Sequence, residues 1–153
     1  MTYYYKKLKS SDVVLLKQLL SIFGQAFNEV DTYQGKIPRD IYLEALLSKE
    51  HFIVLVASDK NGVVGGLTAY VLDKFEQERR EIYIYDLAVL EEHRRRGIAR
   101  DLILKLKQIG RELGVYVIFV QADKADTAAI KLYESLGTRE DVFNFDIEVR
   151  SEQ

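Results

Sequence analysis

The sequence predicts an α+β (mixed α/β) fold, with a central, mixed, mostly antiparallel twisted sheet and about four helices. Two observations predict it. Residues 51–89 hold three apolar segments separated by a turn signal and a charged connector, as in an antiparallel meander. Residues 81–120 follow the order strand, helix, strand, which implies a parallel pair with a right-handed crossover. The chain has 153 residues, so we expect one domain over residues 1–153.

The beginning of the chain predicts a short strand and two helices. Residues 3–8 are a β-like opening, and Ser10 or Ser11 can cap the helix that follows. Apolar residues then recur at three- and four-residue spacing: Leu16, Leu19, Leu20, Phe23 and Phe27. Pro38 stands where the first position of a second helix is expected.

The middle of the chain predicts the meander in detail. Residues 51–57 are strongly apolar, residues 59–62 (Asp-Lys-Asn-Gly) are a hairpin turn signal, and residues 63–72 form the partner strand. A charged connector over residues 74–80 leads to a strand over residues 81–89, where tyrosines stand between aliphatic residues.

The last third predicts two helices and two strands. Residues 97–113 form a long amphipathic helix, and residues 115–120 are continuously apolar, as in a strand covered on both faces. Residues 127–136 form a helix that a glycine ends. Residues 142–149 alternate between apolar and polar, which predicts a last strand.

Composition excludes several classes of function. Cysteine is absent, and His51 and His93 lack ligand spacing, so we expect no metal. The net charge of -2 does not favour nucleic acid. No apolar run approaches the roughly 20 residues of a membrane span. The first eight residues lack an apolar signal core, so a cytoplasmic location is expected.

The most informative segment lies between the strand over residues 81–89 and the helix that follows it. It reads Glu-Glu-His-Arg-Arg-Arg-Gly-Ile-Ala over residues 91–99. A helix start leaves backbone N–H groups unpaired, Gly97 allows close approach of an anion, and the arginines add charged donors. The segment therefore predicts a phosphate-binding turn, with a solvated basic helix start as the alternative.

Two motifs give the sequence a family resemblance. Arg94-x-x-Gly97-x-Ala99 after a strand is similar to the acetyl-CoA pyrophosphate loop of the GNAT superfamily of N-acetyltransferases. Residues 128–137, Ala-Ala-Ile-Lys-Leu-Tyr-Glu-Ser-Leu-Gly, resemble its second motif, including the tyrosine at Tyr133. Thr127 departs from the asparagine that many members carry in that region.

Further segments resemble the aminoglycoside 3-N-acetyltransferases of that superfamily, and the likeness runs from about Phe23 to about Ile147. They are residues 70–72 (Tyr-Val-Leu), 74–77 (Lys-Phe-Glu-Gln), 81–89 (Glu-Ile-Tyr-Ile-Tyr-Asp-Leu-Ala-Val), 120–123 (Val-Gln-Ala-Asp) and 145–147 (Phe-Asp-Ile). The resemblance implies direct acetyl transfer from acetyl-CoA to the 3-amino group of the deoxystreptamine ring of gentamicin-type drugs, and hence resistance to them.

The resemblance also implies where acetyl-CoA lies. The pyrophosphate is expected on the N–H groups of residues 95–99, and the pantetheine along the strand over residues 87–89. Tyr133 is expected to protonate the leaving thiolate, and packing in the core is its alternative role. The expected cofactor-binding residues are Leu87, Ala88, Val89, Arg94, Arg95, Arg96, Gly97, Ile98, Ala99, Arg100 and Tyr133.

The candidates for the general base are carboxylates. Asp86 interrupts an apolar and aromatic strand just before residues 87–89, where burial without a partner would be costly. We expect it to accept the substrate ammonium and its proton; the alternative is a carboxylate held by backbone donors at a strand end. Glu76 is the second candidate, as base or as cation-binding residue. Asp86, Tyr133 and Glu76 are therefore the expected catalytic residues.

A polycationic acceptor needs an acidic cleft with aromatic walls. The residues expected to line it are Asp31, Tyr33, Glu76, Tyr83, Asp86, Asp123 and Asp146. Acetylation of a polyamine or similar small amine would suit the same cleft. A non-catalytic acyl-CoA-binding module is a further alternative, against which Tyr133 and Asp86 argue. A homodimer is compatible with the sequence.

Overall fold

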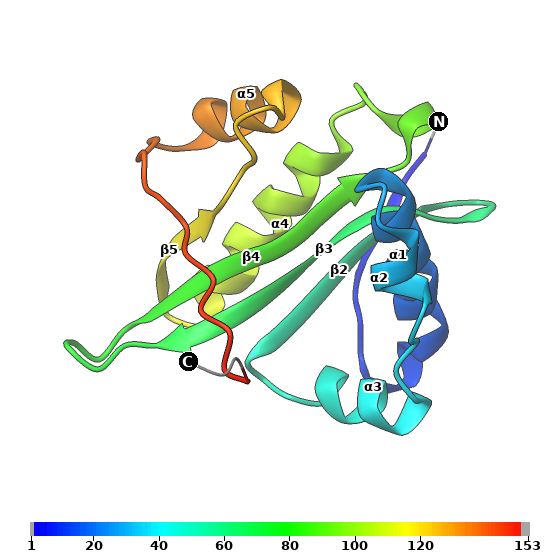
Figure 1. Cartoon of the computed structure of the whole chain (residues 1–153), viewed down its shortest axis with the longest axis horizontal. Coiled ribbons are helices and arrows are strands. Elements are labelled where there is room, and N and C mark those ends of the chain that lie inside the picture. Colours follow the sequence, from blue (N-terminus) through cyan, green and yellow to red (C-terminus); the bar gives the residue numbers. More distant parts are fainter. Residues whose placement is uncertain (1, 151–153) are drawn as a thin grey trace. The chain divides into compact units, whose positions relative to one another are not determined.

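The computed structural model of the chain describes residues 2–150, which form two compact units that divide after Gln121. The first unit holds a five-stranded sheet and four helices, and the second holds one helix (Figure 1). The strands are β1 (Tyr4–Lys7), β2 (Phe52–Asp59), β3 (Gly62–Asp73), β4 (Arg80–Val89) and β5 (Val115–Val120). The α-helices are α1 (Val13–Ala26), α2 (Val30–Gln34), α3 (Asp40–Leu47), α4 (Ile98–Glu112) and α5 (Thr127–Leu136).

The sheet has the predicted mixed topology. Its strands lie in the order β1-β2-β3-β4-β5, with antiparallel pairing from β1 to β4 and parallel pairing between β4 and β5. The α4 crossover joins the parallel pair, as the strand, helix, strand order requires. The predicted α+β class is therefore confirmed.

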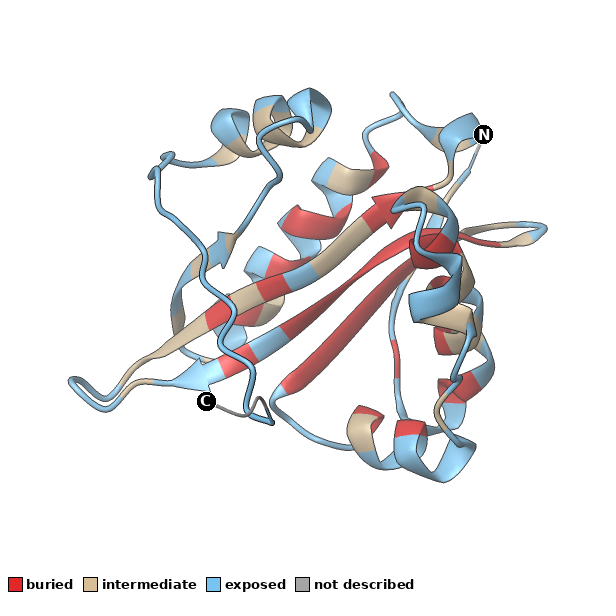
Figure 2. Cartoon of the chain, viewed as in Figure 1, coloured by how far each residue is buried: buried red, intermediate tan, exposed pale blue. Residues whose placement is uncertain are grey.

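Helices cover both faces of the sheet, and Figure 2 shows buried residues along β2, β3 and α4. One core joins α1 and α3 to alternate residues of β2, among them Phe52, Val54 and Val56. The residues between them, such as Ile53 and Leu55, are also buried. Because both faces are covered, β2 needs the unbroken apolar run seen in the sequence.

Several local predictions differ from the structure. A 3-10 helix over Ser10–Asp12 precedes α1 and no serine caps it, α3 begins at Asp40, two residues after Pro38, and β5 is partly exposed rather than covered on both faces. Residues 30–34 form the short helix α2, which no sequence pattern predicted. Residues 142–148 form no strand, and Phe143, Phe145 and Ile147 are exposed. An alternating pattern becomes a strand only where another strand supplies hydrogen bonds, and this segment pairs with none of the described residues. None of the helices described is both long and apolar enough to cross a membrane.

Candidate active site

The C-terminal end of β4 has an open edge. β4 pairs with β5 only from Arg80 to Ile84, although β4 continues to Val89 beside β3. Residues 85–89 therefore lack a strand partner on the β5 side among the described residues. Backbone N–H and C=O groups on such an edge can bond an extended ligand.

A β-bulge beside this edge decides which way Asp86 faces. Thr68 pairs with Asp86 and Ala69 with Ile84, so one residue of β4, Tyr85, has no counterpart on β3. Ile82 lies next to Gly110 of α4, whereas Ala88 belongs to the core with α1. Residues six apart in a regular strand share a face, so the bulge reverses the alternation between them. It brings Asp86 to the α1 side of the sheet.

Asp86 is a half-buried carboxylate without a cationic partner. The Tyr33 hydroxyl donates a hydrogen bond to its Oδ2 at 3.0 Å, and no Lys, Arg or His among the described residues pairs with it. Burial raises the pKa of the Asp86 carboxyl and the nearby Glu29 charge raises it further, while the Tyr33 hydrogen bond lowers it. A carboxylate in this state suits a general base and attracts a cationic ligand.

Close packing of α2 on α1 places Tyr33 against Asp86. A Cβ at Gly24 would stand 3.3 Å from both Tyr33 Cβ and Val30 Cα, so a larger residue would require α2 to move by a few tenths of an ångström. The chain enters α2 through Asn28, whose φ of 54° lies in the left-handed region. The Tyr33 ring packs 5.9 Å from the ring of Phe27, centroid to centroid. The packing of the ring and its place in α2 thus fix the position of the Tyr33 hydroxyl.

An aromatic row extends across the sheet from this point. Successive ring centroids lie 5.2, 6.0, 5.9 and 4.8 Å apart along Phe52, Tyr70, Tyr85, Tyr83 and Phe119. Tyr70, Tyr85 and Phe119 are exposed. The Tyr83 hydroxyl donates to Gln121 Oε1 at 3.0 Å. Aromatic faces beside a carboxylate offer both apolar contact and cation–π attraction to an amine.

Glu76 occupies a different environment from Asp86. It lies in the β3–β4 hairpin, 3.3 Å from Arg79 Nη2 and 3.7 Å from Lys74 Nζ. A hydrogen bond from its own backbone N–H lowers the pKa of the Glu76 carboxyl, as do Arg79 and Lys74. The six steps along β4 from Arg80 to Asp86 span roughly 20 Å. The structure therefore does not bring Glu76 and Asp86 together.

Other predicted acceptor residues are dispersed. Asp31 is exposed in the first turn of α2. Asp123 and Asp146 belong to the second unit, where they accept hydrogen bonds from Ala125 N and Asn144 Nδ2. Sequence reasoning missed Glu29, Tyr70 and Tyr85. Glu29 stands four residues before Tyr33, a helical spacing that would have suggested a shared face had α2 been recognised.

The predicted phosphate loop has the geometry of an anion site. After the short 3-10 helix Glu91–His93, Arg95 and Gly97 both adopt left-handed backbone conformations, with φ of 63° and 79°. Gly97 is the N-cap of α4, so no side chain caps the first helical N–H groups. A Cβ at Gly97 would meet no atom within 4 Å. The loop therefore places the positive end of α4 beside open space, where its N–H groups can approach an anion.

The arginines of this loop have different surroundings. Arg94 Nε donates to the Val89 carbonyl at 3.0 Å, which ties the loop to the end of β4. Arg96 Nη1 donates to the Tyr3 hydroxyl at 3.0 Å. Arg95 and Arg100 are exposed. Arg94 and Arg96 thus brace the loop with their side chains, while Arg95 and Arg100 can approach an anion.

Tyr133 lies in α5, in the second unit. The helix matches the predicted bounds, and Asp126 caps it by accepting a hydrogen bond from Ala129 N at 3.1 Å. Burial and the Asp126 charge raise the pKa of the Tyr133 hydroxyl to about 12. The hydroxyl therefore keeps its proton at neutral pH and can donate it.

Comparison with known proteins places the chain in a family. Residues 16–138 match the sequence profile of the acetyltransferase (GNAT) family. Human N-acetyltransferase 8 is 29% identical over 94 residues, which are 61% of this chain and 41% of the human protein. The match thus spans less than half the length of that relative.

Two solved structures are similar over nearly the whole chain. The aminoglycoside acetyltransferase HMB0005, from an uncultured soil metagenomic sample, has a TM-score of 0.95 at 54% identity and covers 97% of this chain and 99% of its own. The aminoglycoside acetyltransferase meta-AAC0020, also from an uncultured soil metagenomic sample and in complex with sisomicin, has a TM-score of 0.89 at 35% identity. That match covers 97% of each chain.

Proposed function

Because the chain belongs to the acetyltransferase (GNAT) family, we propose that it transfers acetyl from acetyl-CoA to the 3-amino group of gentamicin-type aminoglycosides. The observation that carries this proposal is Asp86, a half-buried carboxylate with no cationic partner, which lies beside an aromatic row. A polycationic sugar supplies the missing positive charge and the apolar ring faces. The two aminoglycoside acetyltransferases of similar structure support this substrate class.

Acetyl-CoA fits the chain at two features of the first unit. The N–H groups of residues 95–99 and the open space beside Gly97 suit the pyrophosphate. The unpaired edge of residues 85–89 suits the amide groups of pantetheine, which can extend a sheet as a strand does. When bound, acetyl-CoA supplies the activated acyl carbonyl, and a Val89 N–H directed at that oxygen would polarise it.

Two side chains of the protein, Asp86 and Tyr133, then each transfer one proton. Asp86 holds the substrate ammonium by a charge-assisted hydrogen bond and takes one proton from it, directly or through water. The freed amine attacks the acyl carbon, forming the C–N bond as the C–S bond breaks. Tyr133 gives its hydroxyl proton to the departing sulfur. The second amine proton then leaves to solvent, Asp86 releases its proton and Tyr133 takes one up from solvent, so that one proton is released for each acetyl group transferred.

The position of the amine rests on family resemblance together with the carboxylates around Asp86. Glu29 and Asp86 add negative charge at one end of the aromatic row, where two neighbouring amines of a deoxystreptamine ring could each find a carboxylate. Acetylation removes one positive charge from the drug. Because such drugs bind an anionic target, its loss would confer resistance on the host.

The test is a thiol-release assay with purified protein and acetyl-CoA against aminoglycosides and polyamines. We expect turnover of gentamicin and sisomicin, with mass spectrometry showing one added acetyl group and NMR placing it on the 3-amino group. Acetylation at another amine would overturn the regiochemistry. Turnover of polyamines alone would favour the second candidate substrate class, because an acidic and aromatic site can also hold a flexible polyamine.

A further inference from the structure

Three segments that are distant in sequence meet beside the phosphate loop. β1 pairs with β2 so that Tyr4 lies opposite Ser58, which places Tyr3 close to Asp59 at the end of β2. His93 lies 3.8 Å from Asp59, measured from Nε2 to Oδ2. Its other ring nitrogen, Nδ1, lies 2.9 Å from the Tyr3 hydroxyl. The chain start, the β2–β3 turn and the loop therefore share one polar cluster.

The donor and acceptor capacity of each side chain indicates which atom donates in each hydrogen bond of this cluster. The guanidinium of Arg96 can only donate, so the Tyr3 oxygen accepts from its Nη1 at 3.0 Å. The Tyr3 hydroxyl hydrogen is then available to His93 Nδ1, and Nε2 of the same ring faces Asp59. The Tyr3 and His93 rings also meet edge to face at 5.7 Å. One hydroxyl thus connects both ends of the loop over residues 93–96.

The cluster is well covered by the protein. The side chains of His93 and Asp59 are only 13% and 8% exposed. The Tyr3 ring lies against His93 and helps to cover it. Between His93 and the start of α4, Arg95 and Gly97 adopt the left-handed conformations that shape the loop.

We propose that Tyr3 and His93 are positioning residues that hold residues 94–97 in the anion-binding conformation before acetyl-CoA binds. This inference rests on the proposed cofactor site and adds to it residues that do not touch the cofactor. A loop with two left-handed residues has many competing conformations when it is unrestrained. Holding it in one of them removes the ordering cost from the binding step.

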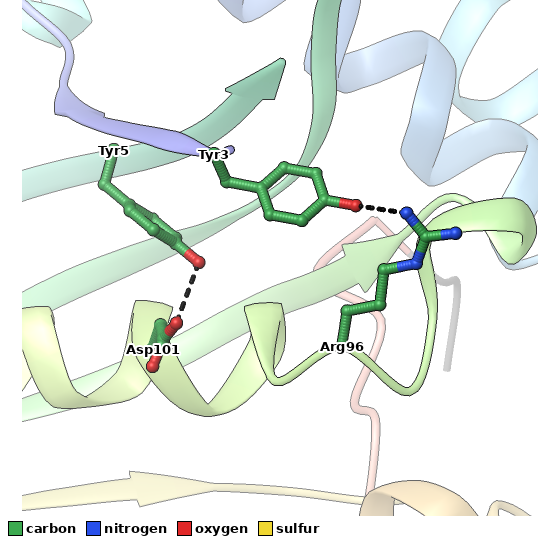
Figure 3. Close-up of a pocket in the computed structure, with 4 residues that line it drawn as sticks. All are labelled: Tyr3, Tyr5, Arg96 and Asp101. Atoms are coloured by element: carbon green, nitrogen blue, oxygen red, sulfur yellow. Dashed lines mark hydrogen bonds between the residues drawn. The ribbon is translucent and has the colours of Figure 1, made fainter. Parts of the chain in front are cut away.

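A neighbouring tyrosine provides a matched control. Figure 3 shows that Tyr3 is directed toward Arg96 in the loop before α4, whereas Tyr5 is directed toward Asp101 of α4. The Tyr5 hydroxyl donates to Asp101 Oδ2 at 3.0 Å. Asp101 lies in the first turn of α4, where its side chain meets Tyr5, so the Tyr5 bond joins β1 to the helix and involves no side chain of residues 94–97.

The test compares Tyr3→Phe with Tyr5→Phe by calorimetric titration of the full chain with acetyl-CoA. We expect Tyr3→Phe to weaken acetyl-CoA binding by about 3- to 10-fold, because the hydroxyl that bonds Arg96 and His93 is lost. Its kcat at saturating substrates should stay at the wild-type value, because the loop does not take part in proton transfer. Tyr5→Phe should bind acetyl-CoA as the wild type does. Equal losses in the two variants, or no loss in Tyr3→Phe, would overturn the proposal.

A double-mutant cycle tests whether Tyr3 acts through the loop. In an Arg96→Met background the Tyr3→Phe change should cost less affinity than in the wild type, because one of its two bonds is already gone. Strictly additive losses would contradict the shared role. Amide hydrogen exchange of the free protein gives a second measurement, in which Tyr3→Phe should speed exchange in residues 94–99 and leave β3 unchanged. Unchanged exchange in residues 94–99 would also contradict it.

Gly97→Asp separates this inference from the proposed function. It places bulk and negative charge in the space beside the loop, so acetyl-CoA affinity should fall severely. If a folded Gly97→Asp variant binds acetyl-CoA normally, the cofactor site itself is misassigned. If Gly97→Asp fails to bind while Tyr3→Phe binds normally, the cofactor site stands and only the positioning role falls.

Discussion

Asp86 and Glu76 are carboxylates near opposite ends of β4, and their environments shift their pKa values in opposite directions. Asp86 is half-buried, lacks a cation and has a raised pKa. Glu76 lies in a hairpin between Lys74 and Arg79 and has a lowered pKa. The cations that keep Glu76 ionised also neutralise its charge. Asp86 has no cationic partner among the described residues, so its charge can bind a positive group of a ligand. Residue type alone does not reveal a base; its neighbours do.

Replacing Asp86 should have the largest effect. Asp86→Asn keeps the size and the hydrogen bond from Tyr33 but removes basicity and charge. We expect kcat/KM for an aminoglycoside to fall by about 10³-fold, since a general base and an ammonium contact are lost together. Calorimetry should show acetyl-CoA binding close to wild type. A variant that keeps nearly normal kcat/KM would make Asp86 structural and turn attention to Glu76.

Tyr133 extends the comparison to a group whose pKa burial also raises, but which acts as an acid. Tyr133→Phe removes only the hydroxyl, so the ring can still pack in α5. Loss of a proton donor should reduce kcat by about 10²-fold, with acetyl-CoA affinity little changed. Steady-state kinetics and calorimetry measure the two quantities. Wild-type kcat would mean that solvent protonates the sulfur and that Tyr133 only packs.

The neighbours of Asp86 should move its pKa in opposite directions. The base must be ionised, so kcat/KM falls as the pH drops through the pKa of Asp86. Tyr33→Phe removes the bond that stabilises the carboxylate, which raises that pKa and moves the acid limb to higher pH. Glu29→Gln removes a negative charge, which lowers the pKa and moves the limb to lower pH. Shifts of the same sign in pH–rate profiles would show that Asp86 does not control this limb.

Glu76→Gln should have the smallest effect and serves as the control for Asp86→Asn. Both changes convert a carboxylate to an amide, but Glu76 lies among exposed ion pairs, which contribute little to function or stability. We expect kcat/KM to change by less than about fivefold, with thermal unfolding near that of the wild type. A loss as large as that of Asp86→Asn would place Glu76 in the acceptor site.

The sequence predicted most elements because their patterns are local. The turn at residues 59–62 and the amphipathic spacing of α4 each depend on neighbouring residues only. The phosphate loop was found for the same reason, since its glycine and the helix start are contiguous. Residues 142–148 show the limit of this approach, because a strand also requires a partner that no local pattern contains.

The sequence by itself determined the mixed sheet, the phosphate loop and the presence of a carboxylate at position 86. Only the tertiary structure decided that a bulge at Tyr85 brings Asp86 to Tyr33, and that Lys74 and Arg79 pair with Glu76. It also decided that Tyr3, which precedes His93 by 90 residues and Arg96 by 93, hydrogen-bonds to both of them. Backbone preferences act between neighbours in sequence, whereas burial, pKa and hydrogen bonding depend on which distant residues folding brings within a few ångströms.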